Sequence, residues 1–440
     1  MLKTLRNAFK IKDLRKKLIF TFLMLVVTRI GSQLPIPGVE TSFFKDFFAQ
    51  QNNDAFGFFN AMTGSSFTNM SVFALSITPY ITSSIIMQLL TIAIPKLEEM
   101  QRDGEDGRKK IAEYTRYVTV GLALIESVAM AVGFGGQGLL KEFNALSIII
   151  AVATMTAGSA LLMWIGERIT EKGVGNGISM VLSFNIISSF PTDASTLYTR
   201  FMSGKSVAVA AVAAIVIIAV IVAIVVFVII LQDGERRIPV QYSKKMQGRK
   251  MVGGQATNIP LKVNTAGVIP VIFASSIMSF PVVISQFFGA SINYNSIGGH
   301  ILAALNSSSW FKPERPVYTI GLAVYVALII VFAYFYTSIT FNPLEVANNM
   351  KKSGGFIPGI RPGKPTSDYL NSILNYIVFI GACGLTIICI VPIMVSGLFN
   401  VSRLSFGGTS LIIIVSVVLE TLKAIESQML VRYYKGFLND

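Results

Sequence analysis

Long apolar runs recur along the entire chain, separated by short polar segments. A helix needs roughly 20 apolar residues to cross a bilayer, whereas a membrane β-barrel would show short strands of alternating polarity. The pattern therefore predicts an all-α polytopic membrane protein. The ten expected transmembrane helices are Leu18–Leu34, Val72–Ile94, Tyr117–Val132, Ala145–Ile165, Gly177–Phe190, Val207–Leu231, Ala266–Phe287, Tyr318–Ile339, Tyr369–Val391 and Thr409–Gln428.

Ten spans divide naturally into two sets of five, within residues 1–200 and 201–440, and the break falls in the loop near Pro191–Lys205. Because five is an odd number, the second set would cross the membrane in the opposite sense to the first. Any internal repeat must then be inverted. Two inverted halves that pack face to face would place a site or a passage between them at the middle of the membrane.

The segment Phe56–Asn69, just before the second span, mixes small or polar residues with scattered Phe and Met. It is too polar to face lipid and too apolar to be a simple loop in water. Irregular backbone at membrane depth survives only where protein or a water-filled cavity surrounds it. We expect a short re-entrant piece inside a cavity formed by the other helices. The alternative is an external loop that folds over the protein surface.

The distribution of charge gives an orientation. The net charge is +14, and most of the 37 lysines and arginines lie in every second loop. Cytoplasmic loops of membrane proteins carry an excess of Lys and Arg, so we place both termini in the cytoplasm. Arg29 and Lys141 are among the few cations on the outer side. The basic N-terminus is not followed by a cleavage site, so we expect no cleavable signal peptide.

Little in the spans suggests catalysis. His300 is the only histidine, and Cys383 and Cys389 do not share a helix face at metal-ligand spacing. We therefore expect no metal, no cofactor and no enzyme activity. A secondary transporter would share the ten spans but would need ionisable groups within the membrane, for which Glu126 is the main candidate. An intramembrane enzyme would need a catalytic pair, which the spans lack.

Two inner loops, 232–265 and 340–368, are too long to be mere connections. In the first, two alternating apolar and polar runs flank a basic, Gly-containing tip at Lys244–Gly254, which predicts a hairpin that projects into the cytoplasm. The second contains a helical stretch, Pro343–Lys352, and then a Pro- and Gly-rich turn that presents Arg361. Such basic projections favour a docking site for an acidic partner, and simple attraction to lipid head groups is the alternative.

Six motifs spread over the chain resemble those of the SecY family, the channel subunit of the bacterial protein translocase. They are ALSITPYITSSIIMQLL in the second span, GVGNGIS before the fifth, RRIPVQYSKK in the first long loop, LKVNTAGVIPVIFASSI entering the seventh span, GFIPGIRPGKPT in the second long loop and FGGTSLIIIV opening the tenth span. Each motif lies at the expected place in the order of spans. The resemblance thus covers essentially the whole chain.

The resemblance implies a clamshell of two inverted five-helix halves around an hourglass pore, closed by a re-entrant plug at about 56–69. It implies an apolar pore ring formed by Ile77, Ile81, Ile178, Leu182, Ile272 and Ile413. The plug positions are Phe59, Asn60, Met62, Thr63, Gly64, Ser65, Ser66 and Phe67. The lateral gate, between the second and seventh spans, would include Gln88, Asn264, Ser276 and Phe280. The docking residues would be Arg236, Arg237, Lys244, Lys245, Arg249, Lys250 and Arg361.

The resemblance also implies a function and partners. A SecY-like channel passes unfolded secretory polypeptides across the bacterial plasma membrane and releases transmembrane segments sideways into lipid. Its companions would be the SecE and SecG subunits. Its driving partners would be the motor ATPase SecA and the ribosome, and its cargo would be signal sequences and preproteins. No nucleotide-binding loop is present, because GEDGRKK at 104–110 lacks the required spacing, so energy would come from a partner.

Overall fold

A computed structural model describes residues 2–43, 60, 62–204, 206–242, 245–247, 250–252, 256–287, 296–306, 310, 316–399 and 408–436. The helices of the first 206 residues are α1 (Leu2–Lys10), α2 (Lys12–Gly31), α5 (Thr78–Ala93), α6 (Pro95–Arg102), α7 (Glu105–Phe134), α8 (Ala145–Lys172), α9 (Gly177–Ser188) and α10 (Phe190–Phe201), with a π-helical turn at Gly135–Leu139. Those that follow are α11 (Val207–Asp233), α12 (Ile269–Phe287), α13 (Ile297–Leu305), α14 (Thr319–Thr340), α15 (Pro343–Lys352), α16 (Lys364–Phe399) and α17 (Gly408–Gly436).

Each of the ten predicted spans contains a helix, which confirms the all-α membrane fold. Within the described residues, α7, α8, α11, α14 and α16 are long and apolar enough to cross a membrane. Helices α5 and α6 make a sixth candidate if the pair, bent by 106° at the break before Pro95, is counted as one span. The α11 helix is apolar on all sides and little of it is buried, as expected for a helix that faces lipid.

The second span begins later than predicted. Its helix starts at Thr78, whereas the expected start was Val72. Residues 72–77 form turns because Ser76 has a left-handed backbone conformation, with φ of 53°, which interrupts any helix that runs through it. Pro79 then lies in the first turn of α5, where its missing N–H costs no hydrogen bond.

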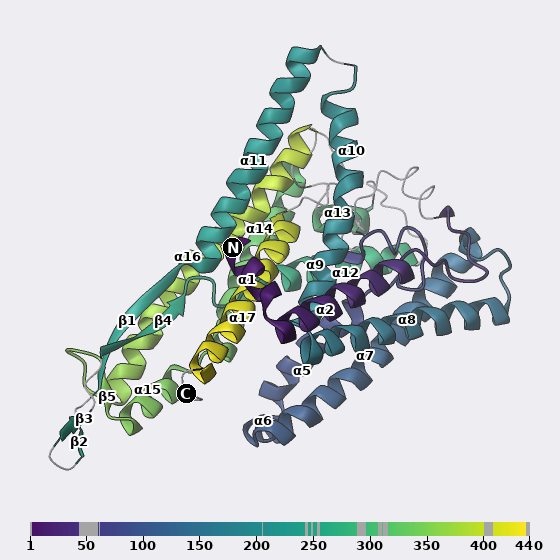
Figure 1. Ribbon diagram of the computed structural model, residues 1–440. Coiled ribbons are helices and arrows are strands. Elements are labelled where there is room, and N and C mark those ends of the chain that lie inside the picture. Colours follow the sequence, from purple (N-terminus) through teal and green to yellow (C-terminus); the bar gives the residue numbers. More distant parts are fainter. Residues whose placement is uncertain are drawn as a thin grey trace.

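The helices pack in two groups (Figure 1). In the first group, α8 packs against α2, α7 and α9, and α5 packs against α7. In the second group, α14 packs between α12 and α16, and α17 packs against α11 and α16. The division of the chain into two sets of five spans and the inverted relation between them remain predictions.

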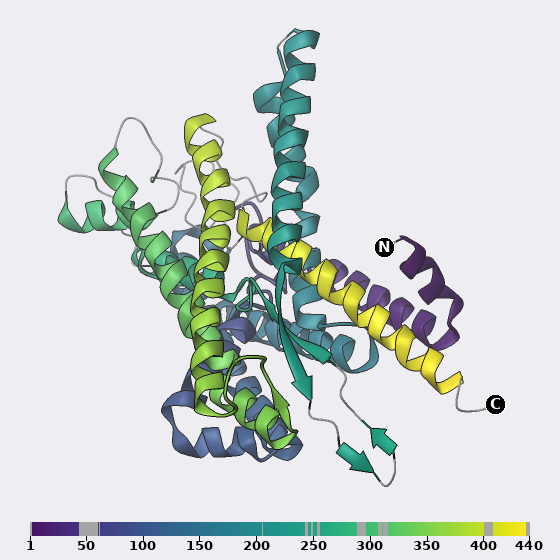
Figure 2. The ribbon, with the colours of Figure 1, turned by 90° about the vertical axis from the view of Figure 1, so that its left-hand side faces the viewer.

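The two groups meet along two seams. On one side α9 packs against α17, and on the other α7 contacts α12. The N-terminal helix α1 also lies against α17, so it links the start of the chain to the second group (Figure 2). Ala8, Leu14, Val174 and Ile425 form a small buried cluster at this junction. A passage between the groups would therefore be bordered by α9 and α17 on one side and by α7 and α12 on the other.

The two long inner loops fold into one small sheet. Strands β1 (Glu235–Tyr242) and β4 (Ala256–Lys262) form an antiparallel ribbon, which confirms the predicted hairpin. The short strand β5 (Gly355–Phe356), from the second long loop, pairs with the end of β1. Near the tip, β2 (Lys245–Gln247) pairs with β3 (Lys250–Val252). Strands β1 and β4 pack against α15 and α16, and the β2–β3 hairpin lies beyond them (Figure 2). The expected helical stretch at Pro343–Lys352 is α15.

Candidate functional site

The six expected pore-ring residues come together in one apolar cluster. Ile77, Leu182, Ile272 and Ile413 are at most 7% exposed and belong to the buried core of this cluster. Ile81 and Ile178 are half-buried and pack against it. The contributing elements are α5 and α9 from the first group of helices and α12 and α17 from the second. The cluster thus lies where the two groups meet.

Local structure fixes these side chains in place. The backbone N–H of Ile81 donates to the carbonyl of Ile77, the N-cap residue of α5, at 3.1 Å, so the two residues lie one turn apart on the same face. At the start of α9, the Asn176 side chain accepts hydrogen bonds from the N–H groups of Ile178 and Ser179. Because of this cap, α9 begins at Gly177. Its first large apolar residue, Ile178, then packs against the apolar cluster.

A close approach of two helices sets the position of α9. A Cβ atom added at Gly177 would lie 2.1 Å from the Gly166 carbonyl oxygen of α8. A Cβ atom added at Gly166 would lie 2.8 Å from Ile178 Cγ1. Only glycine allows this spacing. The GVGNGIS motif therefore combines a helix cap with a contact that brings the first turn of α9 against α8.

The expected plug is buried rather than folded over the surface. Thr63, Ser66 and Phe67 are at most 1% exposed, and Gly64 is also buried. Met62 belongs to the same apolar cluster as the pore-ring residues. Ser65 is half-buried, and Asn60 accepts a hydrogen bond from the Thr68 hydroxyl. Phe59 lies outside the described residues. Burial favours the re-entrant interpretation over an external loop.

The backbone of the segment 64–76, which leads from the expected plug to α5, is strained. Ser65, Met70 and Ser76 have φ values of 67°, 45° and 53°, a region that residues with a side chain rarely adopt. Each such residue costs on the order of 1–3 kcal/mol unless its surroundings hold it there. This conformation of the segment must therefore be maintained by specific contacts.

Polar contacts hold both ends of this segment. At its C-terminal end, Asn185 Nδ2 of α9 donates to Ser76 Oγ at 3.1 Å, and Ser159 Oγ of α8 donates to the Ser76 carbonyl at 3.2 Å. At its N-terminal end, Arg29 Nη1 of α2 donates to the Gly64 carbonyl at 3.1 Å. These anchors were not expected from the sequence, where Arg29 is simply a cation near the end of a span.

The predicted gate residues are not directly joined. Gln88 is exposed on α5, whereas Asn264 is 5% exposed, precedes α12 and lies beside Gly381 of α16. Asn264 Nδ2 is buried without a partner, and no hydrogen bond links it to Gln88 in the described part of the chain. Ser276 is exposed on α12, and the Phe280 side chain lies outside the described residues. The gate assignment stays a prediction.

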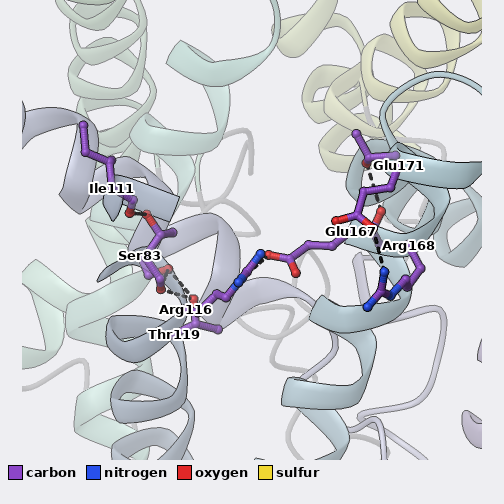
Figure 3. Close-up of polar contacts among 10 residues, drawn as sticks. Ser83, Ile111, Arg116, Thr119, Glu167, Arg168 and Glu171 are labelled. Carbon is purple, nitrogen blue, oxygen red and sulfur yellow. Dashed lines mark hydrogen bonds and ion pairs between the residues drawn. The ribbon is translucent and has the colours of Figure 1, made fainter. Parts of the chain in front are cut away.

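Polar contacts tie α5, α7 and α8 together (Figure 3). Arg116 of α7 points toward Glu167 of α8, and its Nε lies 2.7 Å from the Glu167 carboxylate. Ser83 Oγ of α5 lies 2.5 Å from Thr119 Oγ1 of α7, and both residues are fully buried. These residues were not singled out in the sequence. These contacts support the helix that carries Ile77 and Ile81.

The expected docking residues lie on the two long loops. Arg236 and Arg237 are exposed on β1, and Arg237 Nη2 forms an ion pair with Glu235 at 2.6 Å. Arg361 is exposed on a turn, and its own backbone carbonyl accepts a 2.9 Å hydrogen bond from Thr366 Oγ1. The turn is fixed because Ile357 is buried in a cluster with strands β1 and β4. Lys245 and Lys250 belong to β2 and β3, and Lys244 and Arg249 lie outside the described residues.

No metal centre is found in the described part of the chain. There, no group of three or more His, Cys, Asp or Glu side chains could hold a metal ion. Glu126, the candidate for an ion-coupled transporter, is half-buried on α7. The expected pore-ring residues thus form an apolar cluster, into which Met62 and Phe73 of the adjoining segment also pack.

Comparison with solved structures identifies the fold. A structure described as that of a protein conducting channel matches with a TM-score of 0.62 at 18% identity, covering 94% of this chain and 92% of the other. A SecY structure in which the plug domain stabilises the closed state matches with a TM-score of 0.60 at 18% identity and the same coverage. A canine ribosome–channel complex from the endoplasmic reticulum matches with a TM-score of 0.59 at 16% identity, over 94% and 92% of the two chains.

Sequence comparison identifies the family. The SecY family profile matches residues 71–422. The protein translocase subunit SecY of Halalkalibacterium halodurans is 44% identical over 444 residues, which cover 100% of both chains. That of Streptomyces galbus is 43% identical over 452 residues, again with full coverage of both. A profile match over most of the chain and relatives of this similarity along its full length show that the chain belongs to the SecY family.

Proposed function

We propose that this chain is the protein-conducting channel of a Sec translocase, through which unfolded secretory polypeptides cross the plasma membrane. The observation that carries the proposal is the single apolar cluster that joins Ile77 of α5 and Leu182 of α9 to Ile272 of α12 and Ile413 of α17. Helices from both groups contribute to it, so separation of the groups would open it. The plug residue Met62 packs into the same cluster.

An apolar ring suits a passage that accepts many sequences. Branched aliphatic side chains offer no hydrogen-bonding groups that would select particular residues, and they close around whatever chain occupies the passage. When the ring is empty, an apolar constriction loses its water and resists ions. The plug adds a second barrier on the outer side of the ring.

Transmembrane segments would leave through a seam between α5 and α12, which are the second and seventh predicted spans. A hydrophobic segment that enters this seam exchanges contacts between helices for contacts with its own apolar surface. Each hydrogen bond within the membrane is worth only about 0.6–2 kcal/mol, so burial of a signal sequence would suffice to shift the gate toward its open state. Gln88, Asn264, Ser276 and Phe280 are the residues assigned to this gate.

The driving force would come from cytoplasmic partners. With both termini in the cytoplasm, the ribbon with Arg236 and Arg237 and the turn with Arg361 would face that compartment. Exposed arginines held on ordered loops suit an acidic protein surface or the ribosome. The SecA motor and the translating ribosome are therefore the proposed partners of these loops, and SecE and SecG the proposed companion subunits in the bilayer.

The proposal is tested by reconstitution. The complex of this chain with SecE and SecG is placed in proteoliposomes with SecA and ATP, and the protease-protected fraction of a preprotein is measured. We expect protection that requires ATP, SecA and the signal sequence. Absence of protection from liposomes that hold correctly folded complex would contradict the proposal, and saturable uptake of a small solute driven by an ion gradient would favour a transporter.

A further inference from the structure

We propose that Arg29 is the latch that holds the plug closed, and that its bond to the Gly64 carbonyl must break before the passage opens. This inference rests on the proposed channel function. Nothing in the family resemblance assigns Arg29 a role. It is a positioning residue, because it acts on the plug and not on the translocating chain.

The guanidinium of Arg29 connects three elements. Its Nη1 donates to the Gly64 carbonyl of the plug at 3.1 Å and to Ser188 Oγ at the end of α9 at 3.1 Å. It also donates to Ser32 Oγ at 3.3 Å, just beyond the end of α2. A single cation therefore links the plug to the two helices on either side of it. Hydrogen bonds from a charged donor are stronger than those between neutral groups.

The partners of Arg29 are themselves fixed. Ser188 Oγ donates to the Asn185 carbonyl at 2.6 Å, which leaves its oxygen directed to accept from Arg29. Ser32 Oγ donates to the carbonyl of Arg29 itself at 2.7 Å. The two hydroxyl groups therefore hold the guanidinium in position before the plug arrives, and the Gly64 carbonyl completes the set.

The plug meets α9 at the same point. A Cβ atom added at Gly64 would lie 2.6 Å from both the Asn185 carbonyl and Ser188 Oγ, and Gly64 has a φ of 62°. Only glycine allows the carbonyl to come this close to the guanidinium. The next residue, Ser65, is in the left-handed region and would relax once the contact is lost.

The geometry also favours release. Arg29 is half-buried, so water can reach the guanidinium and replace the Gly64 carbonyl when the plug leaves. The C-terminal end of the segment 64–76 is held separately, by the hydrogen bond that Asn185 Nδ2 donates to Ser76 Oγ. Loss of the Arg29 contact would therefore free the N-terminal part of the plug while Ser76 keeps it tethered.

The test measures efflux of a small anionic dye from proteoliposomes that contain the idle complex, without motor or cargo. Arg29→Met removes the donor and should raise efflux by about tenfold, because a charge-assisted hydrogen bond to the plug is lost. Arg29→Lys keeps the charge but lacks the branched guanidinium and should give an intermediate rate. Ser188→Ala removes one fixed partner and should raise efflux less than Arg29→Met. Lys141→Met is the matched control, since it removes an exposed cation from the same expected side.

The outcomes separate the latch from the channel. A variant that lacks residues 62–67 should show dye efflux at least as fast as that of Arg29→Met. If the deletion variant shows raised dye efflux while Arg29→Met stays at the wild-type rate, the proposed role of Arg29 is wrong and the proposed channel function is unaffected. If the deletion does not leak and the wild-type complex translocates no preprotein, the proposed function itself fails. Should Arg29→Met not fold, wild-type efflux from both Arg29→Lys and Ser188→Ala would overturn the latch.

Discussion

Asn185 of α9 and Ser76, just before α5, are joined by a 3.1 Å hydrogen bond from Asn185 Nδ2 to Ser76 Oγ, and each residue is at most 5% exposed. The bond fixes the point where the plug segment ends and the helix carrying Ile77 and Ile81 begins. It also holds Ser76 in a left-handed conformation, with φ of 53°. A buried polar pair thus lies at the junction between the segment that follows the expected plug and the apolar cluster.

The Ser76→Ala variant should be less stable than the wild type by about 1–3 kcal/mol, because the Asn185 amide would be left buried without a partner. Ser76→Gly loses the same hydroxyl but adopts the left-handed conformation freely, so it should recover about 1 kcal/mol of that loss. The measurement is the free energy of unfolding in mixed micelles titrated with a denaturing detergent. If Ser76→Ala and the wild type have the same free energy of unfolding, the hydrogen bond between Asn185 and Ser76 contributes nothing to stability.

The Gly177→Ala variant should destabilise the protein by about 1–3 kcal/mol, because its Cβ would lie 2.1 Å from the Gly166 carbonyl and would push α9 away from α8. The shift would also move Ile178 and Leu182 out of the apolar cluster. The same unfolding assay checks this prediction. Gly121→Ala is the control: Gly121 is exposed on α7 with no atom within 4 Å of an added Cβ, so alanine should stabilise the helix by about 0.5–1 kcal/mol.

A polar residue in the ring should let ions through. Ile413→Asn places an amide in a position that is 1% exposed within the apolar cluster, so the constriction would hold water when idle. We expect the ion conductance of proteoliposomes containing the idle complex to rise on the order of tenfold. Ile413→Val keeps an apolar surface and should stay close to the wild-type conductance. Equal conductance of Ile413→Asn and Ile413→Val would argue against a hydrophobic seal.

Reversing one exposed charge should weaken motor binding. Arg361→Glu changes a side chain on the fixed turn beside the ribbon, and the apparent affinity for SecA should fall about tenfold. The difference should shrink at high salt, because exposed charges are screened. Fluorescence anisotropy at two salt concentrations measures both effects. Lys109→Glu makes the same charge change on an exposed residue of α7, and an equal loss there would indicate general attraction without a specific site.

Apolar patterning was sufficient to locate α7, α8, α11, α14 and α16, the helices of the described residues that are long and apolar enough to cross a membrane, because a run of Ile, Val and Leu of this length has few other stable structures in a bilayer. The ribbon was also predicted, since alternation in β1 and β4 marks two strands. By contrast, the start of α5 was predicted six residues early. The left-handed conformation of Ser76 depends on Asn185 and Ser159, which lie far away in the sequence.

The candidate site was predicted in part. The six ring positions came from motif resemblance, since an isoleucine in a membrane helix is otherwise indistinguishable from ordinary packing. The pairing of β5 with β1 and the contacts of Arg29 were missed, because both join segments more than 30 residues apart. The only signal in the sequence for the contacts of Arg29 was an arginine near the end of the first predicted span.

The most direct test of the channel places a photo-crosslinking side chain at Ile81, at Ile413 or at Ile218, which is 61% exposed on the lipid-facing helix α11. A secretory polypeptide is stalled halfway through the reconstituted complex, and its crosslinks to each position are compared. The proposed function predicts crosslinks at Ile81 and Ile413 and none at Ile218. A stalled chain that crosslinks at neither ring position would contradict the assignment of this cluster as the passage.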